Sequence, residues 1–154
     1  MKRKAHTARA AQVRPALLVV VHPGSLCGSF WFNGGTAAVL RPLLREIAEW
    51  PGPVVGIANS LHDELDGDDE VAVAYCPAVC EEFEADGFTD ELRAAVIRLL
   101  EAFPAETVRA IKVTGAWVGE DGCASFVAEE LRRRVGGSVP VEISEFAARQ
   151  AAAA

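Results

Sequence analysis

The sequence predicts an α/β fold, namely a three-layer Rossmann-like domain with a mainly parallel sheet of about four strands. Short β-branched apolar runs alternate along the chain with longer segments whose apolar residues recur at helical spacing. The first run, Ala16 to Val21, is apolar at every position, as expected for a strand that is covered on both faces. Helix-length connections between strands imply right-handed crossovers and parallel pairing, so we expect helices on both faces of the sheet.

Four strands and three helices follow from these patterns. The strands are predicted at 16–21, 54–58, 108–114 and 139–143, in the spatial order 2-1-3-4, and the helices at about 36–49, 89–103 and 123–135. Proline is best tolerated in the first turn of a helix, so Pro42 predicts that the first regular helix begins near Arg41. Thr89 is expected to cap the second helix, with Asp90 and Glu91 in its first turn, where the helix dipole favours acids.

The chain is expected to hold one α/β domain over residues 15–147. A basic tail (1–14) and a short tail (148–154) flank it, and an acidic insertion (63–87) interrupts it. The tail 1–14 is interpreted as disordered. Within the insertion, 71–75 is compatible with a short edge strand and 77–84 with a helical turn.

Charge and composition exclude several classes of function. The 154 residues carry a net charge of −7, and no lysine or arginine occurs between Glu46 and Leu92. Nucleic-acid binding needs a basic face, so no nucleic acid is expected as a partner. No apolar run approaches the ~20 residues of a membrane-spanning helix, so we expect no membrane segment. Four scattered cysteines are too few for a disulfide scaffold, which favours a cytoplasmic location.

Reactive and polar side chains cluster where three predicted strands end. In parallel sheets, ligands bind at the carboxyl ends of the strands, where the strand order reverses. With the predicted order, three loops meet at that edge. Their candidate residues are His22, Ser25, Cys27, Ser29 and Asn33 after the first strand, Asn59, His62, Asp63 and Glu64 after the second, and Trp117, Glu120, Asp121, Cys123 and Ser125 after the third.

Two of the cysteines are candidate nucleophiles. Cys123 falls at the expected start of a helix, where free backbone N–H groups stabilise a thiolate or a developing oxyanion. Glu120 and Asp121 would oppose this by raising the thiol pKa, and the alternative is a small cysteine that packs the helix onto the sheet. Cys27 lies in a glycine-rich turn, and it is interpreted either as a functional thiol or as a turn residue without a chemical role.

The histidines have two interpretations each. His22 is interpreted either as a general base or orienting group, or as a residue that makes a local hydrogen bond to the turn backbone. The same two interpretations apply to His62. A third arrangement would join His22 and His62 with Asp63 or Asp121 in a metal site, although no ligand spacing supports it. The segment from Gly24 to Ser29 could hold a phosphate with its backbone N–H groups, but it lacks the lysine of a P-loop, and no cofactor is predicted.

One stretch resembles a known family. "IKVTGAWVGEDGCASFVAEELRRR" is similar to the nucleophile region of isochorismatase-like cysteine hydrolases, in which a strand ends in glycine and Asp-x-Cys precedes a helix. "VVGIANSLH" is similar to the family's second strand and its following histidine, here His62. The resemblance implies Cys123 as the nucleophile position. The family uses an aspartate at the end of its first strand, where this chain has Val21-His22, and a lysine from the middle of the chain, where this chain has no basic residue.

We therefore expect a domain that binds a small neutral or weakly charged molecule. Its finer form is a cysteine-dependent hydrolase, with Cys123 or Cys27 as nucleophile, His22 as base or orienter, and Ser25, Ser29, Asn33, His62 and Asp121 as ligand-binding residues. The alternative is a non-catalytic module that binds a partner protein through its acidic segment. The aromatic residues Phe30, Trp31 and Phe32 would either roof the crevice or form a homo-oligomer interface.

Overall fold

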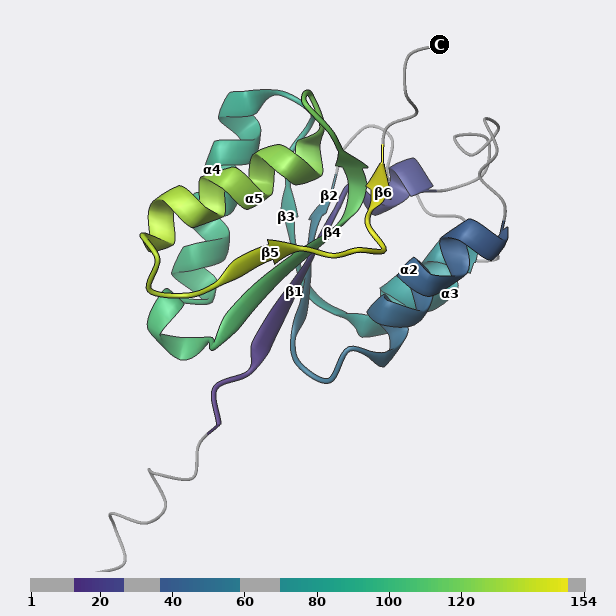
Figure 1. The fold of residues 1–154 in the computed structure, drawn as a ribbon, viewed down its shortest axis with the longest axis horizontal. Helices are drawn as coiled ribbons and strands as arrows, with labels where there is room; N and C mark the ends of the chain where they lie inside the picture. Colours follow the sequence, from purple (N-terminus) through teal and green to yellow (C-terminus); the bar gives the residue numbers. More distant parts are fainter. Residues whose placement is uncertain (1–12, 27–36, 59–69, 150–154) are drawn as a thin grey trace, which may run out of the picture.

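Helices cover both faces of a central sheet in the computed structural model, which describes residues 13–26, 37–58 and 70–149. Figure 1 shows the three layers, with α4 and α5 on one side of the sheet and α2 and α3 on the other. The predicted three-layer α/β fold is thereby confirmed. The elements in chain order are β1 (Ala16–Val21), the 3₁₀ helix η1 (Pro23–Leu26), α2 (Ala37–Glu49), β2 (Val54–Ala58), α3 (Glu70–Ala78), β3 (Val79–Glu84), α4 (Thr89–Ala102), the 3₁₀ helix η3 (Ala105–Thr107), β4 (Ala110–Val118), α5 (Cys123–Val135), β5 (Val141–Ile143) and β6 (Ala148–Arg149).

The sheet has the order β3-β2-β1-β4-β5, and β6 pairs with β4 beyond this path. All of these pairings are parallel. The predicted order of four strands is therefore correct for β2-β1-β4-β5, but two strands were missed. One of them, β6, is Ala148–Arg149, so the sheet includes the first two residues of the predicted tail 148–154.

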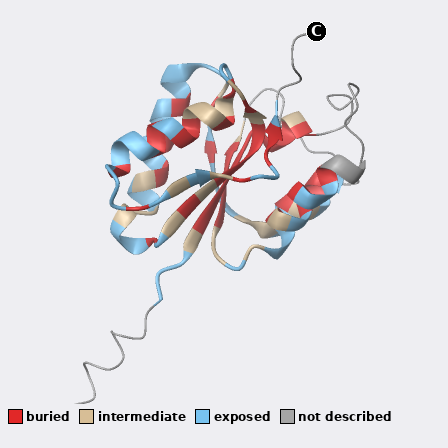
Figure 2. Ribbon diagram, in the orientation of Figure 1, coloured by how far each residue is buried: buried red, intermediate tan, exposed pale blue. Residues whose placement is uncertain are grey.

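Alternation along β1 explains its continuous apolar run. Leu17, Val19 and Val21 belong to the core beneath α4 and α5, whereas Leu18 and Val20 belong to the core beneath α2 and α3. Because both faces of β1 are covered, no position in it can be polar without burying a polar side chain. Figure 2 shows the buried residues concentrated along the strands and the inner sides of the helices.

The segment 70–84 differs most from expectation. The stretch 71–75 belongs to the helix α3, and 79–84 forms the edge strand β3, so helix and strand are reversed relative to the prediction. In α3 the buried residues are Val71, Ala72 and Tyr75, which follow helical spacing. The Tyr75 hydroxyl donates a hydrogen bond to the Glu82 carboxylate and ties this helix to β3.

Two helix starts also differ from the prediction. The helix α2 begins at Ala37 and contains Pro42, which is exposed, so the hydrogen bond that proline cannot donate is lost where water can replace it. The N-cap of α4 is Phe88 rather than Thr89, and no side chain caps it. Within the described ranges, no helix has the length and apolarity needed to cross a membrane.

Candidate functional site

The strand order reverses between β1 and β4, and this is where an open parallel sheet places its ligand crevice. Val21 pairs with Gly115 at the end of β1. A Cβ on Gly115 would lie 2.2 Å from the carbonyl oxygen of Val21, and its φ is +97°. Only glycine fits there, because the two backbones touch. The two strands that bracket the crevice are therefore fixed against one another at their carboxyl ends.

His22 follows β1 directly and is buried, with a positive φ of 48°. Its Nε2 lies 3.0 Å from the carbonyl oxygen of Ala85, so this nitrogen carries the proton and donates it. Its backbone N–H donates to Ile57 at 2.7 Å. His22 therefore links the end of β1 to the ends of β2 and β3. The expected hydrogen bond to backbone exists, but it is not local: the acceptor lies 63 residues away.

Cys123 is the first residue of α5, as predicted, and it is half-buried. The N-cap residue Gly122 has no side chain to cap the helix, so the N–H groups of the first turn stay available at this end. Burial raises the pKa of the Cys123 thiol above its usual range, so the thiol is protonated at neutral pH. The sulfur atom is thus placed at a helix start, but desolvation holds it neutral.

A cavity of about 420 Å³ opens beside Cys123, and we call it the Cys123 cavity. It lies between the start of α4 and the turn that joins β4 to α5. Its lining residues are Gly87, Thr89, Leu92, Gly119, Glu120, Asp121, Gly122, Cys123, Ser125, Phe126 and Glu129. The volume is suited to a small organic molecule.

The turn that closes the cavity is held by its own hydrogen bonds. The Gly119 N–H donates to Ser125 Oγ at 3.0 Å, and the Gly122 N–H donates to the Gly119 carbonyl at 3.1 Å. A Cβ on Gly122 would lie 2.0 Å from the Trp117 carbonyl oxygen, so the turn folds tightly back on itself. The peptide bond between Ala116 and Trp117 is cis. Ser125 thus shapes the cavity wall from within the helix.

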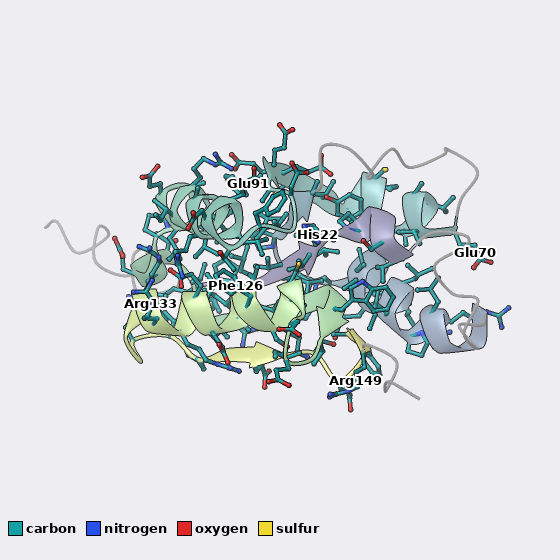
Figure 3. The ribbon with its side chains drawn as sticks, turned by 90° about the horizontal axis from the view of Figure 1, so that it is seen from above. His22, Glu70, Glu91, Phe126, Arg133 and Arg149 are labelled. Atoms are coloured by element: carbon teal, nitrogen blue, oxygen red, sulfur yellow. The ribbon has the colours of Figure 1, made fainter. Side chains whose placement is uncertain are left out.

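His22 and Cys123 both approach the segment 85–87, which joins β3 to α4. His22 bonds to Ala85, and a Cβ on Gly87 would lie 3.9 Å from Cys123 Sγ. Figure 3 looks from above, onto the edge where the strands end, and shows His22 between the two helical layers, with Phe126 on α5. His22 is not among the residues that line the cavity.

Seven of the candidate residues, Cys27, Ser29, Asn33, Asn59, His62, Asp63 and Glu64, lie outside the described residues. The same is true of the aromatic residues Phe30, Trp31 and Phe32. Ser25 is described in η1, where its N–H donates to the His22 carbonyl at 3.0 Å, and it does not line the Cys123 cavity. Asp121 does line the cavity and is exposed.

Sequence reasoning missed the wall that Gly87, Thr89 and Leu92 form at the start of α4. These residues follow β3, and recognising that strand would have placed them at the same sheet edge. In the described part of the chain, no three His, Cys, Asp or Glu side chains are grouped to hold a metal ion.

Comparison of the sequence with models of protein families and with curated proteins found no match.

Proposed function

We propose that this domain binds a small molecule in the Cys123 cavity. The observation that carries the proposal is the position of that cavity. It opens on the carboxyl side of the sheet and is bounded by the turn after β4, one of the two strands at which the strand order reverses. Ligand sites of open α/β sheets lie outside the carboxyl ends of the strands, and the volume of about 420 Å³ suits a small organic molecule.

A fragment screen with a matched pair of variants tests this proposal. Amide shifts of Gly119, Gly122 and Ser125 in ¹H–¹⁵N spectra report on the cavity wall, and fragments that bind there should move them. In Gly87→Leu the new Cβ lies 3.9 Å from Cys123 Sγ and the side chain occupies part of the cavity, so these shifts should weaken. Thr107→Leu, at an exposed site in η3, is the control and should behave as wild type. Fragments that bind Gly87→Leu and wild type equally well would refute the proposal.

The more specific proposal is cysteine-dependent hydrolysis at the same site, which the resemblance to isochorismatase-like cysteine hydrolases favours. The Cys123 sulfur would attack an acyl carbon, the leaving group would depart with a proton, and water would then hydrolyse the thioester. First-turn N–H groups of α5 would hold the developing oxyanion. Against this route, the raised pKa of Cys123 leaves little thiolate at neutral pH, and no Lys or His is among the lining residues.

Hydrolysis of p-nitrophenyl acetate tests this chemistry without knowledge of the natural substrate. A cysteine hydrolase should release p-nitrophenol in a burst whose amplitude is one molecule per protein chain. Cys123→Ser should abolish this burst. Cys76→Ser, at an exposed thiol, should keep it. A burst that survives Cys123→Ser would exclude Cys123 as the nucleophile.

The second candidate function is binding of a basic partner protein through the acidic segment. The edge strand β3 exposes Glu81, Glu82 and Glu84, and this observation supports a negatively charged docking edge. The same charges also protect an edge strand against aggregation. Binding through them should weaken steeply as salt is raised, and binding that is indifferent to salt would contradict this function.

A further inference from the structure

The walls of the Cys123 cavity carry charge of one sign. Glu120, Asp121 and Glu129 contribute carboxylates, and no Lys, Arg or His is among the eleven lining residues. All three carboxylates belong to exposed residues. A ligand that enters this cavity therefore meets a negative potential.

Two helices begin at the cavity, and helix starts ordinarily attract anions. Acidic side chains of the protein lie close to both of them, although none caps the start of α5. Asp90 and Glu91 lie in the first turn of α4, and Glu91 Oε2 also accepts the Asp86 N–H at 2.9 Å. Glu120 and Asp121 directly precede the N-cap of α5. An anionic ligand would have to compete with these groups, so the helix starts do not reverse the sign of the cavity.

Arg93 lies over the ring of Phe126, which lines the cavity, and it is paired with carboxylates. Its guanidinium lies 5.6 Å from the centroid of the Phe126 ring, and it pairs with Asp90 at 3.3 Å and with Glu130 at 3.8 Å. Glu130 is itself shared with Arg133 and Arg134. Among the described residues, the ion pairs of Arg93 go to Asp90 and Glu130 and not to the cavity-lining Glu120, Asp121 or Glu129.

Apolar side chains also belong to the lining of the cavity. Leu92 from α4 and Phe126 from α5 supply them. We propose that the Cys123 cavity takes a small organic cation, an amine or guanidine whose apolar part packs on Leu92 and Phe126 and whose charge faces Asp121 and Glu129. This inference rests on the proposed small-molecule site and narrows its ligand class.

Three probes of similar shape and different charge test the inference: benzylamine, benzyl alcohol and benzoate. Binding is followed by the amide shifts of Gly119, Gly122 and Ser125. We expect benzylamine to bind about tenfold more tightly than either of the others. Each nearby carboxylate contributes a modest attraction in water, and the contributions of several carboxylates add up. Raising the salt concentration should lower the affinity for benzylamine and leave the affinity for benzyl alcohol unchanged.

The double variant Asp121→Asn/Glu129→Gln should lower the affinity for benzylamine by about five- to tenfold and leave benzyl alcohol unaffected. The control is Glu101→Gln/Glu106→Gln, which removes two exposed carboxylates that do not line the cavity and should bind as wild type. If benzyl alcohol or benzoate binds at these residues as tightly as benzylamine, the charge class is wrong while the cavity stands as a ligand site. If no probe moves the three amides, the inference is overturned, and the fragment screen decides separately whether the cavity binds any ligand.

Discussion

Replacing Glu130 by glutamine tests whether a buried carboxylate holds α4 and α5 together. Its side chain is 6 % exposed and accepts hydrogen bonds from Arg133 and from Arg134, the latter at 2.9 Å, while Arg93 reaches it from α4 at 3.8 Å. Removing one partner of a fully buried ion pair costs about 3–5 kcal/mol. The side chains of Arg133 and Arg134 are 63 % and 32 % exposed, so water compensates them in part. We therefore expect Glu130→Gln to lose about 1–2 kcal/mol of unfolding free energy.

The same carboxylate predicts how this loss depends on pH. Burial opposes ionisation of Glu130, but the hydrogen bonds and charges of Arg133 and Arg134 outweigh it and lower its pKa below the ordinary value. A lowered pKa in the folded state means that the contribution to stability is complete above the unfolded pKa of about 4.3 and is lost as pH falls through the folded pKa. The difference between wild type and Glu130→Gln should thus be constant near neutrality and shrink in acid.

Urea unfolding, followed by circular dichroism from neutral pH down into acid, measures this difference. Glu142→Gln, at an exposed position on β5, is the control and should stay within about 0.5 kcal/mol of wild type. In thermal unfolding, 1 kcal/mol corresponds to about 2–4 °C for a domain of this size. A Glu130→Gln protein as stable as the control, or a deficit that persists unchanged in acid, would refute a stabilising role for the ionised carboxylate.

Three further predictions concern the neighbourhood of the site. Gly115→Ala should lower the unfolding free energy, measured in urea, by at least about 3 kcal/mol, because its Cβ would lie 2.2 Å from the Val21 carbonyl oxygen. The control Gly136→Ala, with φ +60° and open space around it, should lose only about 1 kcal/mol. Equal losses would contradict the close contact of β1 and β4. Iodoacetamide should alkylate Cys123 more slowly at neutral pH than the exposed Cys76, as measured by mass spectrometry. The alkylation rate of Cys123 should keep rising as the pH is raised beyond the usual thiol pKa. Fast labelling of Cys123 at neutral pH would contradict a neutral thiol. Thr114→Val should raise the melting temperature by about 2–4 °C, because within the described residues the buried Thr114 hydroxyl has no hydrogen-bond partner. An unchanged or lower melting temperature would show that this hydroxyl makes a hydrogen bond in solution.

The core strands could be predicted because their sequences allow few alternatives. The prediction for β1 matches the observed Ala16–Val21, and for α5 it matches Cys123–Val135. Both segments owe this to strong local patterns. The first is short, β-branched and apolar throughout, and the second carries a helical stripe that ends at two glycines, the first of which adopts the left-handed conformation. In such segments local preference and tertiary packing favour the same structure.

The edge of the sheet could not be predicted from local pattern. In β3 only Phe83 is buried, so the strand has no apolar alternation to reveal it, and its glutamates favour strands poorly. Pairing with β2 makes it a strand despite that preference. The apolar spacing of Val71, Val73 and Tyr75 imitates alternation, yet Val73 is 63 % exposed and the segment is helical. Missing β3 also concealed the α4 wall of the cavity, because that wall is defined by where β3 ends.

The position of His22 bears on whether the site binds or also reacts. The Ala85 carbonyl requires a proton on Nε2, which leaves Nδ1 as the nitrogen that can accept a proton from a thiol in the neutral ring. His22 is buried and does not line the Cys123 cavity, so the geometry does not present that nitrogen to a ligand there. Activation of Cys123 by His22 would require a rearrangement that brings Nδ1 to the thiol, because the described hydrogen bonds of His22 go to Ala85 and Ile57. Binding in the cavity needs no such rearrangement, which is why binding is the function that the described geometry supports most directly.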